Sequence, residues 1–429
     1  MQWTREDVQA FEARGWTIEH AENQMSLLRF GSDRSRAVRP AVLGDGIDLF
    51  TDAEFEACRA EPIEEALWAR FIPASGAATR MFSGFEGPER ERLLARWQRD
   101  ASRSGLSEAG ESAEAAVRRW GSVPKGFLPF WTQDGRWMTA FEAHAQENQL
   151  GKHRAALHFS IPASALAAAE PHLPEARWHV QAPSTDTLAW DVVSDAPART
   201  DDGALRFRPG GHGALLQVLE ALPAGVISIR NVDNVVPLER MARRAGWAEA
   251  LAGCAVRCAR ERDALFEGLD APGGLEAAGT WLRAFYGAAL APQEVRAALC
   301  RPVRVAGMVR AAGHVGGGPF WVRAEAGGAR LGILEGVEVP EGMVPGTHFN
   351  PVELACVPTL PGGQVFHAAQ FSNPAACFTS TKEVEGRTLR ILEHPGLWNG
   401  AMEGWLTRFV ELPADLFRPV KTWEDLIPG

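Results

Sequence analysis

The sequence predicts an α/β fold built on a largely parallel β-sheet. From about residue 67 onward, short apolar runs that are typical of buried strands alternate with helical and loop segments. Four of these runs are "WARFIPA", "AALHFSIP", "RWHVQA" and "AGVISIRNVDNV". Such alternation is typical of a parallel sheet whose faces are covered by helices. The chain has 429 residues, of which 46% are hydrophobic, so it can bury one large core or about two to three smaller ones.

Residues 1–66 are the first predicted unit, an amphipathic helical segment that packs against the main domain. The stretch "TREDVQAFEARG" begins with Thr4 as an N-cap, has acidic residues in its first turn and closes on a glycine. The α/β domain is expected over residues 67–429. It contains a helical insertion at about 237–298, whose amphipathic helices are separated by the breaker "DAPGG". Strand-like alternation then resumes in "PVRVAGMVR", "GPFWVRAE", "ARLGILEGVEV" and "RILEHPGLW".

The composition argues against several classes of function. The formal net charge is -10 and the isoelectric point is near 5.7. A general nucleic-acid binder neutralises many phosphates with Lys and Arg, so this charge argues against one. No uninterrupted apolar run of about 18 to 20 residues is present, and charges stand where a signal peptide needs apolar residues. A cytoplasmic protein without a membrane span is therefore expected.

The six cysteines lack the dense spacing of a disulfide scaffold, so most are expected to be reduced residues of the core. Cys254 and Cys258 lie one helical turn apart and offer two thiolates to a metal. The usual zinc pair is closer in sequence, and no second pair of ligands lies nearby. This spacing favours buried thiols over a metal site.

A loop of small residues follows the first predicted strand. In "FIPASGAATRMF", residues 75–78 have little or no side chain, so a phosphate can approach the backbone closely. Arg80 comes next and can hold phosphate oxygens with two parallel hydrogen bonds. Ligands of open α/β sheets bind at such strand ends, where the next helix offers free N–H groups. An ordinary strand-to-helix turn explains the same residues equally well.

Two further loops carry groups suited to a nucleotide. In "GSVPKGFLPF", Pro124 restricts the backbone and Lys125 offers a point charge to a phosphate, unless it is a solvated surface lysine. In "LRFRPGGHGALLQVLE", glycines surround His212 immediately before a predicted helix. Backbone of this kind can lie against a flat base or a phosphate, although a hairpin or a helix-entry loop also explains the glycines.

The buried strand in "AGVISIRNVDNVVP" ends in a carboxylate flanked by amides. Asp233 stands between Asn231 and Asn234 at this strand end, where it can hold Mg²⁺ against phosphate oxygens. The alternative is an Asx turn that caps the next helix.

The C-terminal stretch "VELPADLFRPVKTWEDL" has two cations that can reach an anionic ligand. They are Arg418 and Lys421. Alternatively, both are surface charges beside Asp415 and Glu424.

Taken in order, these five stretches resemble the UDP-sugar pyrophosphorylase family, which includes UDP-glucose and UDP-N-acetylhexosamine pyrophosphorylases. That family has a G-G-x-G-T-R-[LM] loop, a later P-K, a P-x-G-H-G loop, an N-x-D-N strand end and a terminal P-V-K-[TN]-x-x-D-L. The corresponding stretches here are "SGAATRM", "PKGFLP", "RPGGHGAL", "NVDN" and "RPVKTWEDL", between about residues 70 and 427. The whole chain also resembles a bacterial family classed as a domain of unknown function.

The resemblance implies a Rossmann-like, GT-A-like nucleotidyltransferase fold with a mixed, mostly parallel sheet. It also implies a Mg²⁺-dependent reaction in which a nucleoside triphosphate, with UTP favoured, and a sugar 1-phosphate give a nucleotide sugar and pyrophosphate. The part from about 300 to 429 would bind the sugar phosphate. A monomer or small homo-oligomer is expected, because the C-terminal β-helix of several pyrophosphorylases has no counterpart after "TWEDLIPG".

The resemblance also assigns roles to individual residues. Arg80 and Lys125 would contact the β and γ phosphates, Lys421 the phosphate of the sugar, and Asp233 the Mg²⁺. Gln181, in "HVQAPSTDT", would read a uracil edge. The implied nucleotide-binding residues are Ser75, Gly76, Ala77, Ala78, Thr79, Gln181, Gly211 and His212. The candidates for binding the sugar phosphate are Asn234, Glu335, Asn350, Glu393, Asn399 and Arg418, whose amides, carboxylates and guanidinium suit hydroxyl and phosphate groups. For the residues at 335, 350, 393 and 399, a structural role is an equally good explanation.

The chain departs from the family pattern at two points. Ser75 and Ala78 stand where glycines are usual, and Lys125 follows Arg80 by about 45 residues, farther than in the typical loop. Two other functions are compatible with the same strand-end carboxylate and loops. One is a GT-A-type glycosyltransferase, and the other is a non-catalytic protein that binds nucleotide sugars.

Overall fold

The computed structural model describes most of the chain. The described residues are 3–30, 36–76, 78–100, 106–108, 110–133, 136–208, 210, 215–222, 225–312, 317–324, 327–344, 346–373, 376–384 and 386–426. Every structural statement below concerns these residues.

A mixed sheet of nine strands forms the centre of the described structure. In spatial order its strands are β2 (Val42–Leu43), β3 (Gly46–Asp48), β19 (Leu406–Glu411), β13 (Val303–Met308), β16 (Glu353–Val357), β12 (Val226–Ile229), β4 (Trp68–Pro73), β7 (Ala156–Ile161) and β8 (Arg177–Val180). All neighbouring pairs are parallel except those that include β16, which runs antiparallel to β12 and β13. The expected mixed, mostly parallel sheet is confirmed.

The four strands predicted first form one half of this sheet. Strands β12, β4, β7 and β8 lie side by side, and the residues of β4 and β12 are buried throughout. Four strands of the sheet, β2, β3, β16 and β19, have no counterpart among the predicted runs. Strand β16 lies between β12 and β13 and runs antiparallel to both. Its pairing with these strands depends on tertiary contacts rather than on a local sequence pattern.

Three smaller sheets complete the described β-structure. One contains β1 (Ala37–Pro40), β14 (Gly318–Arg323) and β15 (Ala329–Leu334). The second contains β9 (Thr187–Asp191), β10 (Ala196–Pro197), β11 (Phe207–Arg208), β17 (Phe378–Val384) and β18 (Arg387–Glu393). The third is the hairpin of β5 (Pro129–Gln133) and β6 (Arg136–Thr139).

The N-terminal segment is only partly helical, which corrects the prediction for residues 1–66. Helices α1 (Arg5–Glu12), α2 (Ile18–Phe30) and α3 (Asp52–Arg59) are present, and Thr4 caps α1 as expected. Between α2 and α3 the chain forms three strands. Strand β1 pairs with β14, β2 pairs with β3, and β3 pairs with β19. Strands of two to four residues are too short to show periodicity, so their partners decide their structure.

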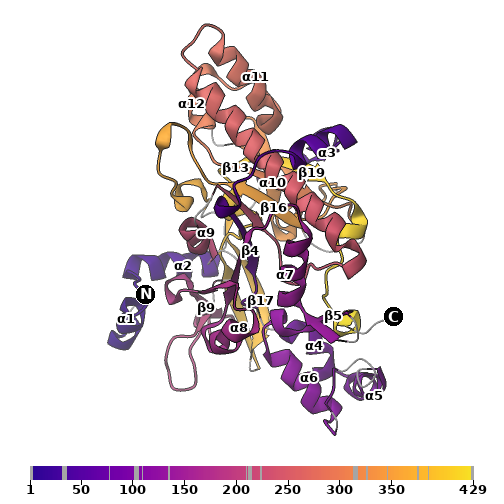
Figure 1. The fold of residues 1–429 in the computed structure, drawn as a ribbon. Helices are drawn as coiled ribbons and strands as arrows, with labels where there is room; N and C mark the ends of the chain where they lie inside the picture. Colours follow the sequence, from indigo (N-terminus) through magenta and orange to yellow (C-terminus); the bar gives the residue numbers. More distant parts are fainter. Residues whose placement is uncertain are drawn as a thin grey trace.

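The segment predicted to be a helical insertion is helical in the structure. It consists of α10 (Leu238–Glu267), α11 (Gly274–Tyr286) and α12 (Pro292–Leu299). Figure 1 shows α11 and α12 at one end of the molecule and α5 and α6 near the other. Helix α10 packs on β12, β13 and β16 and against α3. The remaining helices are α4 (Thr79–Phe82), α5 (Arg90–Asp100), α6 (Ala113–Ser122), α7 (Ala140–Leu150), α8 (Leu166–His172) and α9 (Leu216–Ala221).

The cysteines are free thiols, and five of the six are buried. Cys254 and Cys258 belong to α10 and face the hydrophobic core, as expected for structural thiols. Within the described ranges, no group of three or more His, Cys, Asp or Glu side chains is arranged to hold a metal ion. None of the described helices has the length and apolar character needed to cross a membrane.

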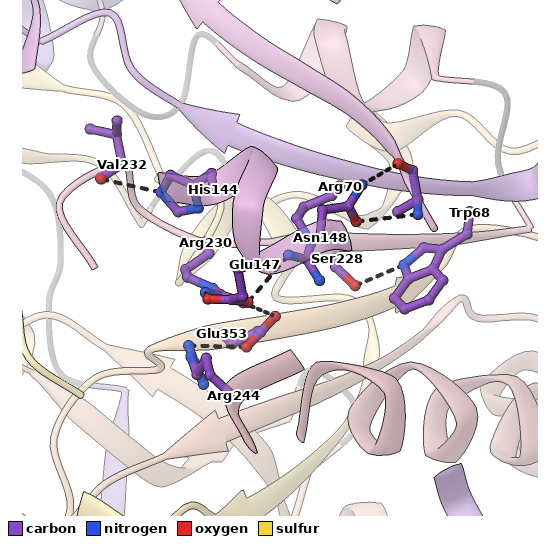
Figure 2. Close-up of polar contacts among 11 residues, drawn as sticks. Trp68, Arg70, His144, Glu147, Asn148, Ser228, Arg230, Val232, Arg244 and Glu353 are labelled. Carbon is purple, nitrogen blue, oxygen red and sulfur yellow. Dashed lines mark hydrogen bonds and ion pairs between the residues drawn. The ribbon is translucent and has the colours of Figure 1, made fainter. Parts of the chain in front are cut away.

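A network of buried ion pairs joins α7 and α10 to the centre of the large sheet (Figure 2). Glu147 of α7 accepts hydrogen bonds from Arg230, which follows β12, at 2.6 and 2.7 Å, and from Arg70 of β4 at 3.2 Å. Glu353 of β16 pairs with Arg230 and with Arg244 of α10, at 3.1 and 3.0 Å. All five side chains are at most 3% exposed. Charges this deeply buried persist only when they are paired, so the network fixes the relative positions of these elements.

Replacing Glu147 by Gln should strongly destabilise the protein, because the buried arginines would lose one of their two carboxylates. We expect the free energy of unfolding to fall by about 3–5 kcal/mol in chemical denaturation. Burial alone would raise the pKa of Glu147, but attraction to Arg230 and Arg70 outweighs it and lowers the pKa to about 2. The wild type should therefore lose stability as the pH falls from about 4.3, the value in the unfolded chain, toward 2.

The matched control is Ser228→Ala, which removes the hydrogen bond that Ser228 of β12 accepts from Trp68 Nε1 of β4 at 3.0 Å. We expect this control to lower the free energy of unfolding by about 1 kcal/mol. A loss of stability in Glu147→Gln no larger than that of the control would show that the network contributes little.

Candidate functional site

The candidate site lies at the carboxyl edge of the large sheet. The loop at 74–79 follows β4, Gln181 follows β8, and Asp233 follows β12. Because these strands are parallel, their carboxyl ends meet at one edge, where ligands of open α/β sheets bind. Strand β16 runs the other way, so Asn350, three residues before it, approaches the same edge.

Two lysines converge on Asp233. The ammonium groups of Lys125 and Lys421 each lie 2.9 Å from the same carboxylate oxygen, Oδ2. The chain has 44 Lys and Arg residues but only four lysines, at 125, 152, 382 and 421, so two of the four meet at this carboxylate. The side chain of Lys125 is 18% exposed, which is not the geometry of a solvated surface lysine. Residues from positions far apart in the chain thus form one cationic site around a carboxylate.

Asp233 is buried and charged. Burial alone would raise the pKa of its carboxyl, but attraction to Lys421 and Lys125 outweighs this and lowers it. Its second oxygen, Oδ1, is buried and has no hydrogen-bond partner among the described residues. Asn234 uses its Nδ2 to donate to the carbonyl of Val352 at 3.0 Å. Helix α10, which comes next, has no side-chain cap, so the alternative of an Asx turn capping it is not what the structure shows.

Backbone contacts hold the C-terminal segment beside this strand end. The N–H of Val420 donates to the carbonyl of Asp233 at 2.9 Å, and Asn234 forms an isolated antiparallel bridge with Pro419. These contacts place Lys421 next to Asp233.

The loop after β4 lies against the segment that carries Lys125. The N–H of Lys125 donates to the carbonyl of Gly76 at 3.2 Å, and the N–H of Ala78 donates to the carbonyl of Val123 at 3.1 Å. Thr79 Oγ1 donates to the carbonyl of Gly121 at 3.3 Å. The loop and Lys125 therefore lie side by side, despite their separation in sequence.

Two details of the loop differ from expectation. The helix that follows, α4, has a single turn, so it provides little of the expected helix-end charge. Ala78 is fully buried in an apolar cluster rather than facing a ligand. Gly76 is exposed, and a Cβ added there would meet nothing within 4 Å, so the backbone is accessible. Ala77 and the side chain of Arg80 lie outside the described part of the chain.

The segments predicted to hold the base lie together. Gln181 Nε2 donates to Thr185 Oγ1 at 3.4 Å, in the turn after β8. A Cβ added at Gly210 would lie 2.0 Å from the carbonyl oxygen of Thr185, so only glycine permits this approach. The glycine-rich loop therefore begins against the turn of Gln181. Gly211 and His212 lie outside the described residues.

Three residues predicted to bind the sugar phosphate also form a group. Burial raises the pKa of Glu335, and the carboxylates of Glu338 and Glu393 raise it further, whereas a hydrogen bond with Asn350 opposes the shift. Glu393 pairs with Lys382 at 3.0 Å, a partner that the sequence did not indicate. This group contains several hydrogen-bond acceptors, as a hydroxyl-rich ligand requires.

Asn399 and Arg418, which were also predicted to bind the sugar phosphate, have different surroundings. Asn399 is 1% exposed, and neither its Nδ2 nor its Oδ1 has a partner among the described residues. Arg418 is exposed, and its guanidinium lies over the ring of Trp131 at 5.1 Å. Asp415 pairs with Arg243 rather than with Arg418.

A comparison with family models shows the family of this chain. The family model described as "Domain of unknown function (DUF4301)" matches residues 4–100 and 114–428. The chain belongs to this family. The resemblance to a family of that class is thereby confirmed, and no curated protein is significantly similar to this DUF4301 member in sequence.

Several solved structures are similar to this DUF4301 protein. A point mutant of UDP-glucose pyrophosphorylase from Leishmania major has a TM-score of 0.53 at 15% identity, over 98% of this chain and 77% of that one. UDP-glucose phosphorylase from Trypanosoma brucei has a TM-score of 0.52 at 12% identity, over 98% and 77%. Uridine diphosphate N-acetylglucosamine pyrophosphorylase from Trypanosoma brucei has a TM-score of 0.50 at 13% identity, over 98% and 82%. At these identities the likeness shows a shared fold.

Sequence analysis missed two residues of α7, His144 and Glu147, that contact the segment before Asp233. His144 Nε2 lies 3.2 Å from the carbonyl oxygen of Val232, and Glu147 binds Arg230. The available signals were an arginine directly after the buried strand "VISI" and a His and a Glu three residues apart on one helix face. A buried arginine needs a carboxylate, and Glu147 is the partner that α7 supplies.

Gly126→Ala should disturb the position of Lys125. A Cβ at Gly126 would lie 2.0 Å from the ring of Phe141 on α7, so the 125–127 turn must move. We expect a loss of about 1–3 kcal/mol in the free energy of unfolding. The control is Gly279→Ala in α11, where a Cβ meets nothing within 4 Å and a helix gains up to about 1 kcal/mol. Equal stability of the two variants would contradict the close packing at Gly126.

Proposed function

We propose that this protein is a nucleotidyltransferase that condenses a nucleoside triphosphate, with UTP favoured, and a sugar 1-phosphate into a nucleotide sugar and pyrophosphate. The observation that carries the proposal is the convergence of Lys125 and Lys421 on Asp233 at the carboxyl edge of the sheet. The fold shared with UDP-sugar pyrophosphorylases supports it.

The reaction needs positioning and charge neutralisation rather than a strong base. An oxygen of the sugar 1-phosphate attacks the α-phosphate, the bond to the β-phosphate breaks, and pyrophosphate leaves. The attacking oxygen is already anionic, so no proton has to be removed. Lys125 and Lys421 would exchange their contact with Asp233 for phosphate oxygens, and Arg80 would add a third cation.

The residues fit Mg²⁺ as a cofactor. Asp233 has one buried oxygen without a partner, and Asn231 and Asn234 on the same turn each have a buried Oδ1 without a partner among the described residues. Carboxylate and amide oxygens are suitable ligands, and Mg²⁺ is commonly bound by one or two carboxylates together with substrate phosphates. When bound, Mg²⁺ would neutralise negative charge on the triphosphate.

The preference for UTP is supported by Gln181, whose turn lies against the start of the glycine-rich loop. The group of Glu335, Asn350 and Glu393 supports a sugar as the second substrate. The amide of Gln181 can both donate to and accept from the edge of a uracil.

A substrate matrix tests the function. UTP, ATP, GTP, CTP and dTTP are each combined with a panel of sugar 1-phosphates and Mg²⁺, and pyrophosphate release is measured. We expect release to require both substrates and to be fastest with UTP. Sugar transfer from a UDP-sugar to an acceptor without pyrophosphate release would indicate a glycosyltransferase. Tight binding of UDP-sugars without exchange of labelled pyrophosphate would indicate a non-catalytic binding protein.

Asp233→Ala and Lys125→Ala should each lower kcat/KM for pyrophosphate release by about 10²–10³, because each removes charge stabilisation at the phosphates. Thermal unfolding should show that both variants remain folded. Lys152→Ala is the matched control, since Lys152 is exposed between α7 and β7, and it should leave the rate unchanged. Near-normal turnover in both site variants would overturn the assigned roles.

A further inference from the structure

We propose that His144 of α7 is a positioning residue for Asp233, holding the strand end so that its carboxylate faces Lys125 and Lys421. The expected effect on turnover rests on the proposed function. The contact between His144 and the strand end can be tested without any substrate. Within the described structure, the imidazole hydrogen-bonds to the backbone carbonyl of Val232, so its effect on Asp233 passes through the backbone.

The contact joins α7 to the residue before Asp233. His144 Nε2 lies 3.2 Å from the carbonyl oxygen of Val232, and only the protonated Nε2 can donate to that oxygen. The ring lies near that of Phe159, with centroids 6.4 Å apart, and is fully buried. Figure 2 shows the ring directed from α7 toward Val232.

His144 is an uncharged hydrogen-bond donor through its Nε2–H group. Burial, together with the positive charge of Arg230 and Arg70, lowers the pKa of His144 to about 3. The imidazole is therefore uncharged at neutral pH, and the carbonyl of Val232 fixes its tautomer. Nδ1 is buried and has no hydrogen-bond partner among the described residues. Within that part of the chain, the ring therefore makes its hydrogen bond through Nε2 to Val232.

One helix thus holds the strand end at two points. Glu147, one turn after His144, binds Arg230 with two hydrogen bonds, and His144 binds Val232. The two contacts lie on either side of residue 231 and leave the turn that begins there little freedom. Asp233 in turn receives the N–H of Val420, so a shift of the turn would also move Lys421.

Four substitutions separate positioning from general stability. His144→Phe keeps a ring but removes the donor. His144→Gln can place its amide nitrogen where Nε2 lies, whereas the shorter Asn of His144→Asn reaches only the position of Nδ1. Ser228→Ala is the control for loss of a buried hydrogen bond on β12. Its partner, Trp68 of β4, lies beside the beginning of β12, whereas Asp233 follows the end of β12.

The first readout needs no substrate. A short pulse of acetic anhydride labels amines, and mass spectrometry measures the rate at each of the four lysines. An ammonium must leave Asp233 before its nitrogen can react. In His144→Phe and His144→Asn, Lys125 and Lys421 should react about three- to tenfold faster than in the wild type, whereas Lys152 and Lys382 should not change. His144→Gln and Ser228→Ala should resemble the wild type.

The second readout is kinetic. In His144→Phe and His144→Asn, kcat for pyrophosphate release should fall about ten- to hundredfold while KM for the nucleotide stays within about twofold, because alignment rather than binding is lost. His144→Gln should restore most of kcat. If His144→Phe does not fold, the comparison of the Asn and Gln variants decides the question.

The outcomes distinguish the two proposals. Lysine rates that are the same in wild type, His144→Asn and His144→Gln would overturn the positioning role, whatever the activity. A wild type that releases no pyrophosphate would overturn the proposed function, while the labelling rates would still decide the role of His144. An equal rise in lysine reactivity in Ser228→Ala would show general loosening and would also overturn the proposal.

Discussion

The pair of hydrogen bonds between Glu147 and Arg230 is the interaction on which the candidate site depends. Arg230 continues from a fully buried strand, so its guanidinium cannot reach solvent and must find a carboxylate inside the protein. Glu147 supplies it from α7, and Glu353 supplies a second from β16. Buried pairs of this kind add little net stability over apolar residues, but breaking one is costly. The network therefore sets a specific arrangement of α7, β12 and β16, and the strand end with Asp233 is a consequence of it.

Lysines around Asp233 would suit the proposed function, in which each ammonium leaves the carboxylate for a phosphate oxygen. A guanidinium would bind the carboxylate with two parallel hydrogen bonds and hold it in a fixed geometry. An ammonium is a compact point charge on a flexible stem, so it can turn from Asp233 Oδ2 to a phosphate oxygen without rearranging the backbone. In a chain that uses arginine for nearly all its other cations, Lys125 and Lys421 fit this requirement. In the structure, the same carboxylate pairs with both cations.

Much of the fold was predictable, because long buried strands and amphipathic helices have local patterns. Strands β4, β7, β8 and β12 and helix α10 are of this kind. The short strands β1 to β3 and the antiparallel β16 were not predictable, since their pairing comes from distant partners.

At the site, the order of motifs pointed to Asp233, Lys125 and Lys421, and the structure brings the three side chains together. The roles of these residues in catalysis stay predictions. The support from His144 and Glu147 was missed because a polar residue on a buried helix face shows no partner in sequence. Gly211 and His212 lie outside the described residues, so their predicted roles stay predictions too.

The departures of the loop from the family pattern have different consequences at its two ends. Ala78 is fully buried among apolar side chains, and its N–H is bonded to Val123, so its methyl group takes no space from a ligand. Ser75 is half-buried next to Gly76, which is exposed and has open space around its Cα. The position at which a phosphate would need a glycine is therefore 76, where the chain has one. Alanine at 78 is compatible with phosphate approach because the fold directs that residue into the core, and this leaves Ser75 as the one substituted position that borders the open side of the loop.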